Sequence, residues 1–166
     1  MTSEKNKIMD APTIAKTIKR IAYQIYEHHY EEKQLVLAGI SKNGVILAQR
    51  ICKEIETISD IEVIFIEILI NKKSPREAVV LSQELSLCKH RPVVVVDDVL
   101  NTGSTLMYAV THFLSLSLKM LQTAVLVNRN HKKFPIKGDF KGISLSTAVK
   151  EHISVEFGEN EGVYLS

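Results

Sequence analysis

Cysteine is scarce in this chain, which contains only two among its 166 residues. Cys52 and Cys88 fall in different predicted elements and lack the spacing of metal ligands. This pattern argues against a disulfide scaffold and predicts free thiols in a reducing compartment. We therefore expect a cytoplasmic protein.

An apolar signal core and long apolar runs are also missing. The first seven residues, Met1–Lys7, are mostly polar, which argues against a secretory signal. The most apolar stretch, residues 61–70, carries Glu62 and Glu67 and is too short to cross a bilayer. We expect a soluble protein without a membrane partner.

Charge of one sign is not in large excess, since 21 Lys and Arg residues and 19 Asp and Glu residues leave a formal net charge of +2. Nothing in this balance demands a nucleic acid as partner. The chain also shows no internal repeat, no low-complexity linker and no convincing Ser-His-Asp or Cys-His set. Its length fits one domain over residues 1–166 with a sizeable core.

What the chain does contain is an alternation of apolar strands and amphipathic helices. Strands are predicted over residues 35–40, 61–70, 93–96 and 123–127. Helices are predicted after Asp10, after Gly44 and after Thr105. Residues 78–90 fit either a hairpin arm or a short helix, and the tail alternates short strands with polar turns. This order indicates an α/β fold with a largely parallel sheet, in which ligands bind beyond the carboxyl ends of the strands.

The most informative segment, residues 93–105, reads Val-Val-Val-Val-Asp-Asp-Val-Leu-Asn-Thr-Gly-Ser-Thr. The four valines predict a strand buried on both faces, and Asp97 and Asp98 follow them. Two ionised carboxylates about 6 Å apart repel by about 3 kcal/mol at an effective dielectric constant of about 20, so the pair favours a ligand or a cation. Because neighbouring strand residues point to opposite faces, we expect the strand to end before both acids.

The loop that follows these acids suits a phosphate group. A glycine-containing turn at a helix start offers backbone N–H groups and a positive dipole end. Carboxylates beside such a turn can accept hydrogen bonds from sugar hydroxyls. Each feature alone also fits an ordinary loop or helix N-cap, but their conjunction predicts a ribose-phosphate pocket.

Residues 93–105 resemble the 5-phosphoribosyl-1-pyrophosphate (PRPP) signature of the type I phosphoribosyltransferases: a hydrophobic strand, two acids and a Thr-Gly-x-Thr loop. The resemblance implies the type I phosphoribosyltransferase fold, with a mostly parallel central sheet flanked by helices and a small hood. It implies that Asp97 and Asp98 are catalytic and hold the ribose hydroxyls. It also implies Mg²⁺ bound through PRPP, with Asp97 and Asp98 as the candidate direct ligands. The PRPP 5′-phosphate would be bound by Asn101, Thr102, Gly103, Ser104 and Thr105.

The same resemblance implies binding roles for two further loops. In the family, pyrophosphate binds after the first core strand, which here gives Ser41, Lys42, Asn43 and Gly44. An ordinary turn contains the same residue types. The family's mobile hood loop follows the second strand, and its basic residues here are Lys72, Lys73 and Arg76. A solvated basic loop has the same composition.

Residues 124–140 resemble the corresponding segment of the bacterial pyrimidine-operon attenuator proteins that are also uracil phosphoribosyltransferases. For the nucleobase, this resemblance implies contacts from Arg129, Phe134, Pro135 and Ile136. A basic surface loop is the alternative. The chain departs from that subfamily in a shorter hood loop without a Tyr-Arg-Asp-Asp run, and in Asn128, which replaces an acid.

The implied reaction transfers ribose 5-phosphate from PRPP to a nucleobase, in first place uracil, and yields UMP and pyrophosphate. Three alternatives stay open: a purine enzyme for hypoxanthine or guanine, a nucleotide-sensing RNA-binding regulator of pyrimidine genes, and a domain that binds PRPP without turnover. The regulator's partner would be an mRNA leader, contacted by Lys16, Lys19, Arg20, Arg129, Lys132, Lys133, Lys137 and Lys141. The resemblance also implies a homodimer or a higher homo-oligomer.

Overall fold

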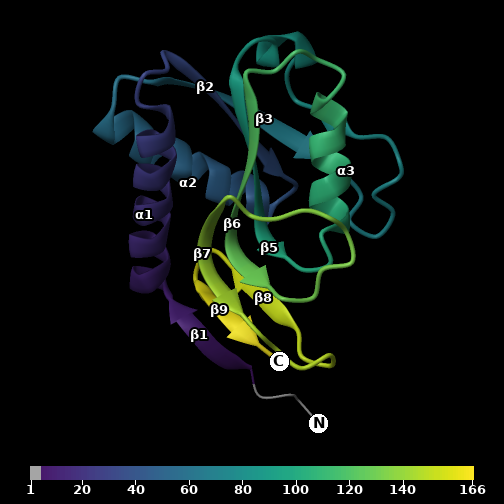
Figure 1. Cartoon of the computed structure of the whole chain (residues 1–166). Coiled ribbons are helices and arrows are strands. Elements are labelled where there is room, and N and C mark those ends of the chain that lie inside the picture. Colours follow the sequence, from purple (N-terminus) through teal and green to yellow (C-terminus); the bar gives the residue numbers. More distant parts are fainter. Residues whose placement is uncertain (1–4) are drawn as a thin grey trace.

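The computed structural model describes residues 5–166, so the polar start of the chain lies partly outside the described residues. The main sheet has six strands in the order β4-β3-β2-β5-β6-β7, and within it only β4 runs antiparallel to its neighbour (Figure 1). The strands are β2 (Gln34–Ile40), β3 (Glu62–Leu69), β4 (Val80–Leu81), β5 (Pro92–Leu100), β6 (Met120–Arg129) and β7 (Phe140–Leu145). The predicted α/β fold with a mostly parallel sheet is confirmed.

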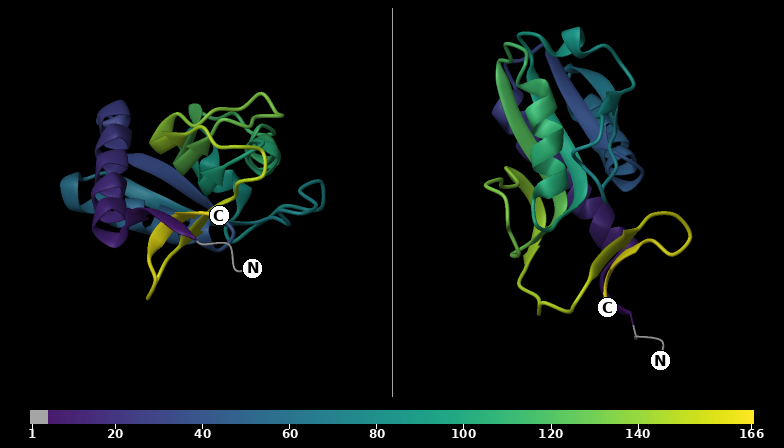
Figure 2. Two further views of the ribbon diagram at one scale, coloured as in Figure 1. Left: turned by 90° about the horizontal axis from the view of Figure 1, so that it is seen from below. Right: turned by 90° about the vertical axis from the view of Figure 1, so that its right-hand side faces the viewer.

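Three helices cover the two faces of this sheet. They are α1 (Ala11–His29), α2 (Asn43–Ile58) and α3 (Ser104–Phe113). Helices α1 and α2 lie on one face and α3 on the other (Figures 1 and 2). As predicted, Asp10 caps α1, and its carboxylate accepts a hydrogen bond from the N–H of Thr13. No helix within residues 5–166 has both the length and the apolar character needed to cross a membrane.

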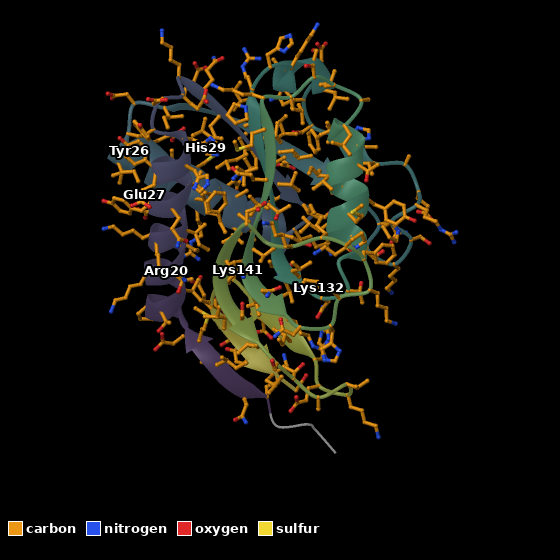
Figure 3. The ribbon with its side chains drawn as sticks, in the orientation of Figure 1. Arg20, Tyr26, Glu27, His29, Lys132 and Lys141 are labelled. Atoms are coloured by element: carbon orange, nitrogen blue, oxygen red, sulfur yellow. The ribbon has the colours of Figure 1, made fainter. Side chains whose placement is uncertain are left out.

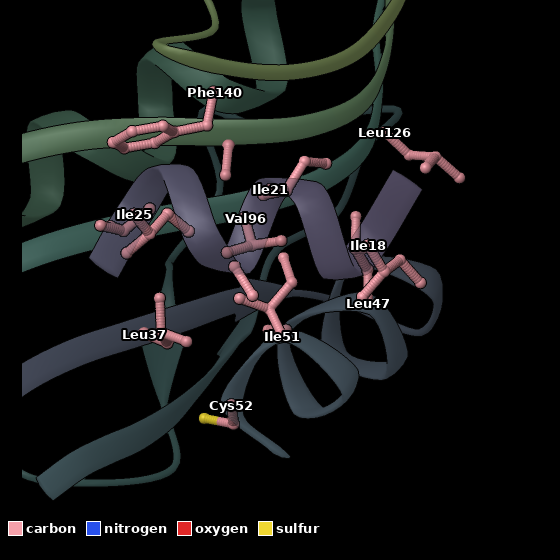
Figure 4. Packing of buried hydrophobic residues seen from close by; sticks show 14 of the residues in the cluster. Ile18, Ile21, Ile25, Leu37, Leu47, Ile51, Cys52, Val96, Leu126 and Phe140 are labelled. Carbon is pink, nitrogen blue, oxygen red and sulfur yellow. The ribbon is translucent and has the colours of Figure 1, made fainter. Parts of the chain in front are cut away.

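The alternation of side chains along β5 explains why its valines are contiguous. Val94 and Val96 belong to the core cluster packed with α1 and α2, whereas Val93 and Val95 belong to the cluster packed with α3. Figure 4 shows Val96 close to isoleucines of α1 and α2. Both faces of a central parallel strand are buried, so neither face can take a polar residue until the strand reaches the edge of the sheet.

A second, three-stranded antiparallel sheet, here called the hood sheet, has the order β1-β9-β8. It is built from β1 (Asn6–Asp10), β8 (Ile153–Glu156) and β9 (Gly162–Leu165), which lie together at the lower edge of Figure 1. The side chain of Asn43, at the start of α2, donates a hydrogen bond to the carbonyl oxygen of Val155 at 2.8 Å. The hood sheet therefore closes over the carboxyl ends of the central strands.

The prediction that the valine strand ends before its two acids was wrong. Strand β5 continues to Leu100 and stays paired with β6 up to that residue. Its pairing with β2 stops earlier, at Val96, so Asp97 and Asp98 have no β2 residue beside them. One edge of β5 therefore has no strand partner at the acids, and the start of α2 lies beside Asp97 instead.

Residues 78–90 contain both of the forms that the sequence left open. Strand β4 forms a hairpin arm against β3, and a short 3₁₀ helix, η1 (Leu85–Cys88), follows it. The other predicted strands are present with longer bounds, most clearly β6, which begins at Met120 rather than near Thr123.

Gly39, near the end of β2, lets α2 approach the sheet closely. A Cβ atom at this position would lie 2.7 Å from the carbonyl oxygen of Gly44 and 2.8 Å from the Cα atom of Val45. Both are backbone atoms, so they can yield only if the start of α2 moves. This close approach sets the position of the turn between β2 and α2.

We expect Gly39→Ala to lower the free energy of unfolding by about 2 kcal/mol, because overpacking against backbone strains the core. Gly138→Ala is the matched control, since its nearest neighbours are side-chain atoms of Val125 and Lys141, which can move. The free energy of unfolding of Gly138→Ala should fall by less than about 1 kcal/mol. Urea unfolding followed by circular dichroism measures both values. Equal losses in the two variants would contradict the close approach at Gly39.

Candidate functional site

The two acids of β5 lie at the carboxyl edge of the sheet with a lysine between them. Asp97 and Asp98 are 3% and 9% exposed. The Nζ atom of Lys72, in the loop after β3, lies 2.8 Å from Oδ1 of Asp97 and 3.2 Å from Oδ1 of Asp98. The cation that the paired carboxylates favour therefore comes from the chain itself.

This arrangement drives the pKa values of the two carboxyls apart. Burial raises the pKa of Asp97 to about 7, the negative charge of Asp98 adds to the rise, and the ammonium of Lys72 opposes it. Burial also acts to raise the pKa of Asp98, but the charge of Lys72 and the hydrogen bonds of Asp97, Asn43 and Lys72 outweigh it and lower the pKa. Near neutral pH, one carboxyl is firmly ionised and its neighbour can exchange a proton.

The turn after β2 contributes one side chain to the acids. The amide nitrogen of Asn43 donates to Oδ2 of Asp98 at 3.0 Å and also to the Val155 carbonyl oxygen. The hydroxyl of Ser41 instead joins the turn to the end of β3, through the carbonyl oxygens of Ile68 and Ile70. Of the four residues predicted to bind pyrophosphate, only Asn43 lines the cavity at the acids.

Backbone strain is concentrated in the same turn. Lys42 has a φ angle of 57° and exposes its side chain. Residues other than glycine rarely adopt this conformation, and it costs about 1–3 kcal/mol. The sharp reversal brings the first turn of α2 beside the acids, and Gly44 fits there because a Cβ atom would lie 2.9 Å from the Val96 carbonyl oxygen.

The loop after β5 begins helix α3 and faces the same cavity. Gly103 has a φ angle of 88°, which glycine adopts without steric cost, and α3 begins at Ser104. Its N-cap residue, Gly103, has no side chain that could cap the helix, and the Thr102 hydroxyl accepts a hydrogen bond from the N–H of Ser104 at 3.3 Å. The next N–H groups of α3 and the hydroxyls of Thr102, Ser104 and Thr105 can receive an anion. The structure brings this loop and both acids into one cavity, as the sequence predicted.

That cavity has a volume of about 460 Å³, and its walls come from three places. One wall consists of residues 97–106, which include the acids and the loop. Asn43 and Lys72 form a second wall, and His152–Val155 of the hood segment form the third. This third wall is not among the residues predicted from the sequence. No motif marks residues 152–155, because only the return of the chain through the hood sheet brings them there.

The predicted base-binding residues lie elsewhere. The N–H groups of Lys133 and Phe134 donate to the Thr102 carbonyl oxygen, at 2.8 and 3.0 Å, from behind the loop. Pro135 and Ile136 line a separate shallow groove beside α3. Arg129 is buried, 8% exposed, and is not part of the cavity wall.

Of the three basic residues predicted for the hood loop, only one reaches the cavity. Lys72 reaches the acids, whereas Lys73 and Arg76 are exposed and do not line the cavity. Within residues 5–166, no group of three or more His, Cys, Asp or Glu side chains is placed to hold a metal ion. The two acids can therefore supply at most part of a cation's ligands.

Comparison with known proteins places this site in a family. The sequence profile of the phosphoribosyl transferase domain matches residues 4–160. The bifunctional protein PyrR of Streptococcus thermophilus is 35% identical over 164 residues, which are 96% of this chain and 94% of the relative. The pyrimidine operon regulatory protein of Lactococcus lactis is 34% identical over 161 residues, 95% of this chain and 93% of the relative.

A solved structure agrees in fold. The hypoxanthine phosphoribosyltransferase of Trypanosoma cruzi superposes with a TM-score of 0.80 at 16% identity, and the match covers 96% of this chain and 95% of the other. The chain has the type I fold that the resemblance implied. The chain therefore belongs to the phosphoribosyltransferase family, as a PRPP-dependent pentosyltransferase similar to the PyrR proteins.

Proposed function

We propose that this protein transfers ribose 5-phosphate from PRPP to uracil and releases UMP and pyrophosphate. The observation that carries the proposal is the single cavity that contains two buried acids and a helix start whose N-cap residue is a glycine. The choice of uracil rests on the relatives, which include bifunctional PyrR proteins and pyrimidine operon regulatory proteins. Hypoxanthine or guanine is the alternative substrate.

Different residues of the cavity wall are suited to different parts of PRPP. Asp97 and Asp98 accept hydrogen bonds from the ribose hydroxyls, and residues 101–105 bind the 5′-phosphate through N–H groups and hydroxyls. The pyrophosphate end then lies toward Asn43 and the turn of residues 41–44. The base lies against His152–Val155, which face the acids across the cavity.

In the reaction, the bond from C1′ of the ribose to the pyrophosphate oxygen breaks, and its electron pair leaves with pyrophosphate. A ring nitrogen of the base bonds to C1′ and loses its proton. Negative charge on the acid pair favours the positive charge that develops on the ribose. Asp97, with a pKa of about 7, is suited to accept the proton of the base.

Mg²⁺ fits the chemistry of this site, because carboxylate and phosphate oxygens are the ligands that it prefers. Asp97 and Asp98 would hold it together with oxygen atoms of PRPP. When bound, it would offset the charge of the pyrophosphate leaving group.

Lys72 occupies the position that the ribose and its cation would take. We infer that PRPP displaces the Lys72 ammonium from the acids, and that the loop of residues 71–77 then follows the pyrophosphate. Lys73 and Arg76, which are exposed now, would be carried toward the phosphates by the same movement. In this proposal, Lys72, Lys73 and Arg76, the three cations predicted for the hood loop, all move with the loop toward the phosphate groups of PRPP.

The central test is pyrophosphate release with PRPP and Mg²⁺ against uracil, hypoxanthine, guanine, xanthine, adenine and orotate. We expect turnover with uracil. The double variant Asp97→Asn and Asp98→Asn should lose about a hundredfold or more of kcat while keeping the native circular dichroism spectrum. Asp60→Asn is the control, since its side chain lies at the opposite end of the sheet. Full activity in the double variant would exclude the role assigned to the acids.

Lys72→Met tests the contact between the loop and the acids. Because Lys72 lowers the pKa of Asp97, its removal should move the titration of that carboxyl above about pH 7. The raised pKa means that the folded state holds a proton that the unfolded chain has released. The contribution of Asp97 to stability therefore falls as pH rises from about 4 to about 7, and this fall should extend further in Lys72→Met.

Carbon-13 NMR of the aspartate carboxyls, together with urea unfolding at several pH values, measures both effects. Lys73→Met is the matched control, because Lys73 adjoins Lys72 and has no contact with the acids. If the Asp97 titration were unchanged in Lys72→Met, the ammonium would not reside between the carboxylates in solution.

A second function, RNA binding, is favoured by the basic surface beside β7. Arg20 of α1 donates to the carbonyl oxygens of Lys141 and Gly142, so α1 and β7 form one face. Burial, and then repulsion from the positive charge of Lys141, lower the pKa of Lys132. Figure 3 labels these three cations. Arg129 is buried and contributes nothing to this surface.

For the RNA function, we expect binding to a structured pyrimidine-operon leader to weaken steeply as salt increases. Lys141→Gln should reduce the slope of log K against log salt by about 1 and leave pyrophosphate release unchanged. Filter binding between low and moderate salt measures the slope. Absence of binding at low salt would remove this function.

A further inference from the structure

The turn at the end of β6, residues 129–134 and here called the bridge turn, contacts one wall of the cavity and the segment that leads into another wall, without lining the cavity itself. On one side, its N–H groups at Lys133 and Phe134 hold the carbonyl oxygen of Thr102. On the other side, Asn130 and His131 bond to residues 146 and 147, at 3.1 and 2.9 Å. The bridge turn therefore joins the proposed phosphate loop to the segment that leads into the hood sheet.

Arg129 makes this connection through a single side chain. Its Nε donates to the hydroxyl of Thr147 at 2.6 Å, its Nη2 to the Ala148 carbonyl oxygen at 2.9 Å, and its Nη1 to Oδ1 of Asn101 at 3.4 Å. No carboxylate of residues 5–166 forms an ion pair with it. All its contacts are neutral oxygens on two separate segments.

Those two segments carry opposite walls of the cavity. Asn101 is the first residue of the loop proposed to bind the 5′-phosphate. Thr147 and Ala148 belong to residues 146–151, which continue directly into the His152–Val155 wall. A displacement of the loop at Asn101 would therefore be transmitted by a buried, planar group to the wall proposed to face the base.

We propose that Arg129 is a positioning residue that couples occupancy of the 5′-phosphate loop to the position of the base wall. This inference rests on the proposed function of residues 101–105. The sequence predicted that Arg129 contacts the nucleobase. The proposal instead gives it a role outside the cavity, where it contacts the segments that carry both walls. The flat guanidinium holds three acceptors at fixed angles, which a lysine ammonium cannot reproduce.

The test is amide hydrogen exchange with ribose 5-phosphate, which carries the phosphate and the sugar but no base. In the wild-type protein, we expect it to slow exchange over residues 101–105 and also over residues 146–151, which it does not touch. In Arg129→Lys, the protection of 101–105 should persist and that of 146–151 should be lost. Arg91→Lys is the matched control, because Arg91 likewise donates to neutral oxygens, one of a side chain and one of a carbonyl, at the opposite end of β5.

A second measurement uses two ligands. Arg129→Lys should weaken UMP, which spans both walls, by about tenfold more than ribose 5-phosphate, which spans one. Thr147→Val removes the acceptor at 2.6 Å and should act in the same direction, so the test survives if Arg129→Lys does not fold.

Three results would overturn the coupling: wild-type protection confined to 101–105, retention of both protected segments in Arg129→Lys, or equal weakening of the two ligands. A wild-type protein in which ribose 5-phosphate protects neither segment would instead overturn the proposed phosphate loop, and the coupling with it. The two failures therefore give different exchange maps.

Discussion

The contact on which the rest of the site depends is the lysine ammonium between two buried carboxylates. Two acids at the end of a fully apolar strand would repel each other where water cannot screen them, so the fold must supply a positive charge. Lys72 supplies it from the loop after β3, and Asn43 adds a hydrogen bond from the start of α2. Strands β2, β3 and β5 are neighbours in the sheet, and this order allows all three segments to meet.

The same contact explains how the two acids stay buried side by side. An ionised carboxylate in a partly closed cavity is stable only while a cation neutralises it. The chain provides that cation from Lys72, on a loop that is otherwise exposed. The proposed displacement of Lys72 by PRPP would replace one partner of the acids by another without a change in the sheet.

Around this centre, two sheets share one core. The acids and the start of α3 stand on β5, which is buried between both helical layers. The hood sheet packs into the core cluster of α1 and α2 through Ile153, Val155 and Val163, and Asn43 adds a hydrogen bond to the Val155 carbonyl oxygen. The chain shares its fold with a hypoxanthine phosphoribosyltransferase at only 16% identity, so this fold is common to proteins whose sequences have diverged widely.

The sequence alone determined the α/β class, the parallel sheet and the succession of strand, two acids and helix start, because these depend on local patterns: buried valines, adjacent acids and a glycine turn. It also indicated that the acids favour a ligand or a cation. Only the tertiary structure decided that Lys72 is this cation, that β5 continues past the acids, and that His152–Val155 form the opposite wall. It also placed Arg129 and Phe134–Ile136 behind the phosphate loop. These are contacts between segments distant in the chain, and no local pattern specifies which distant segment returns to which edge of a sheet.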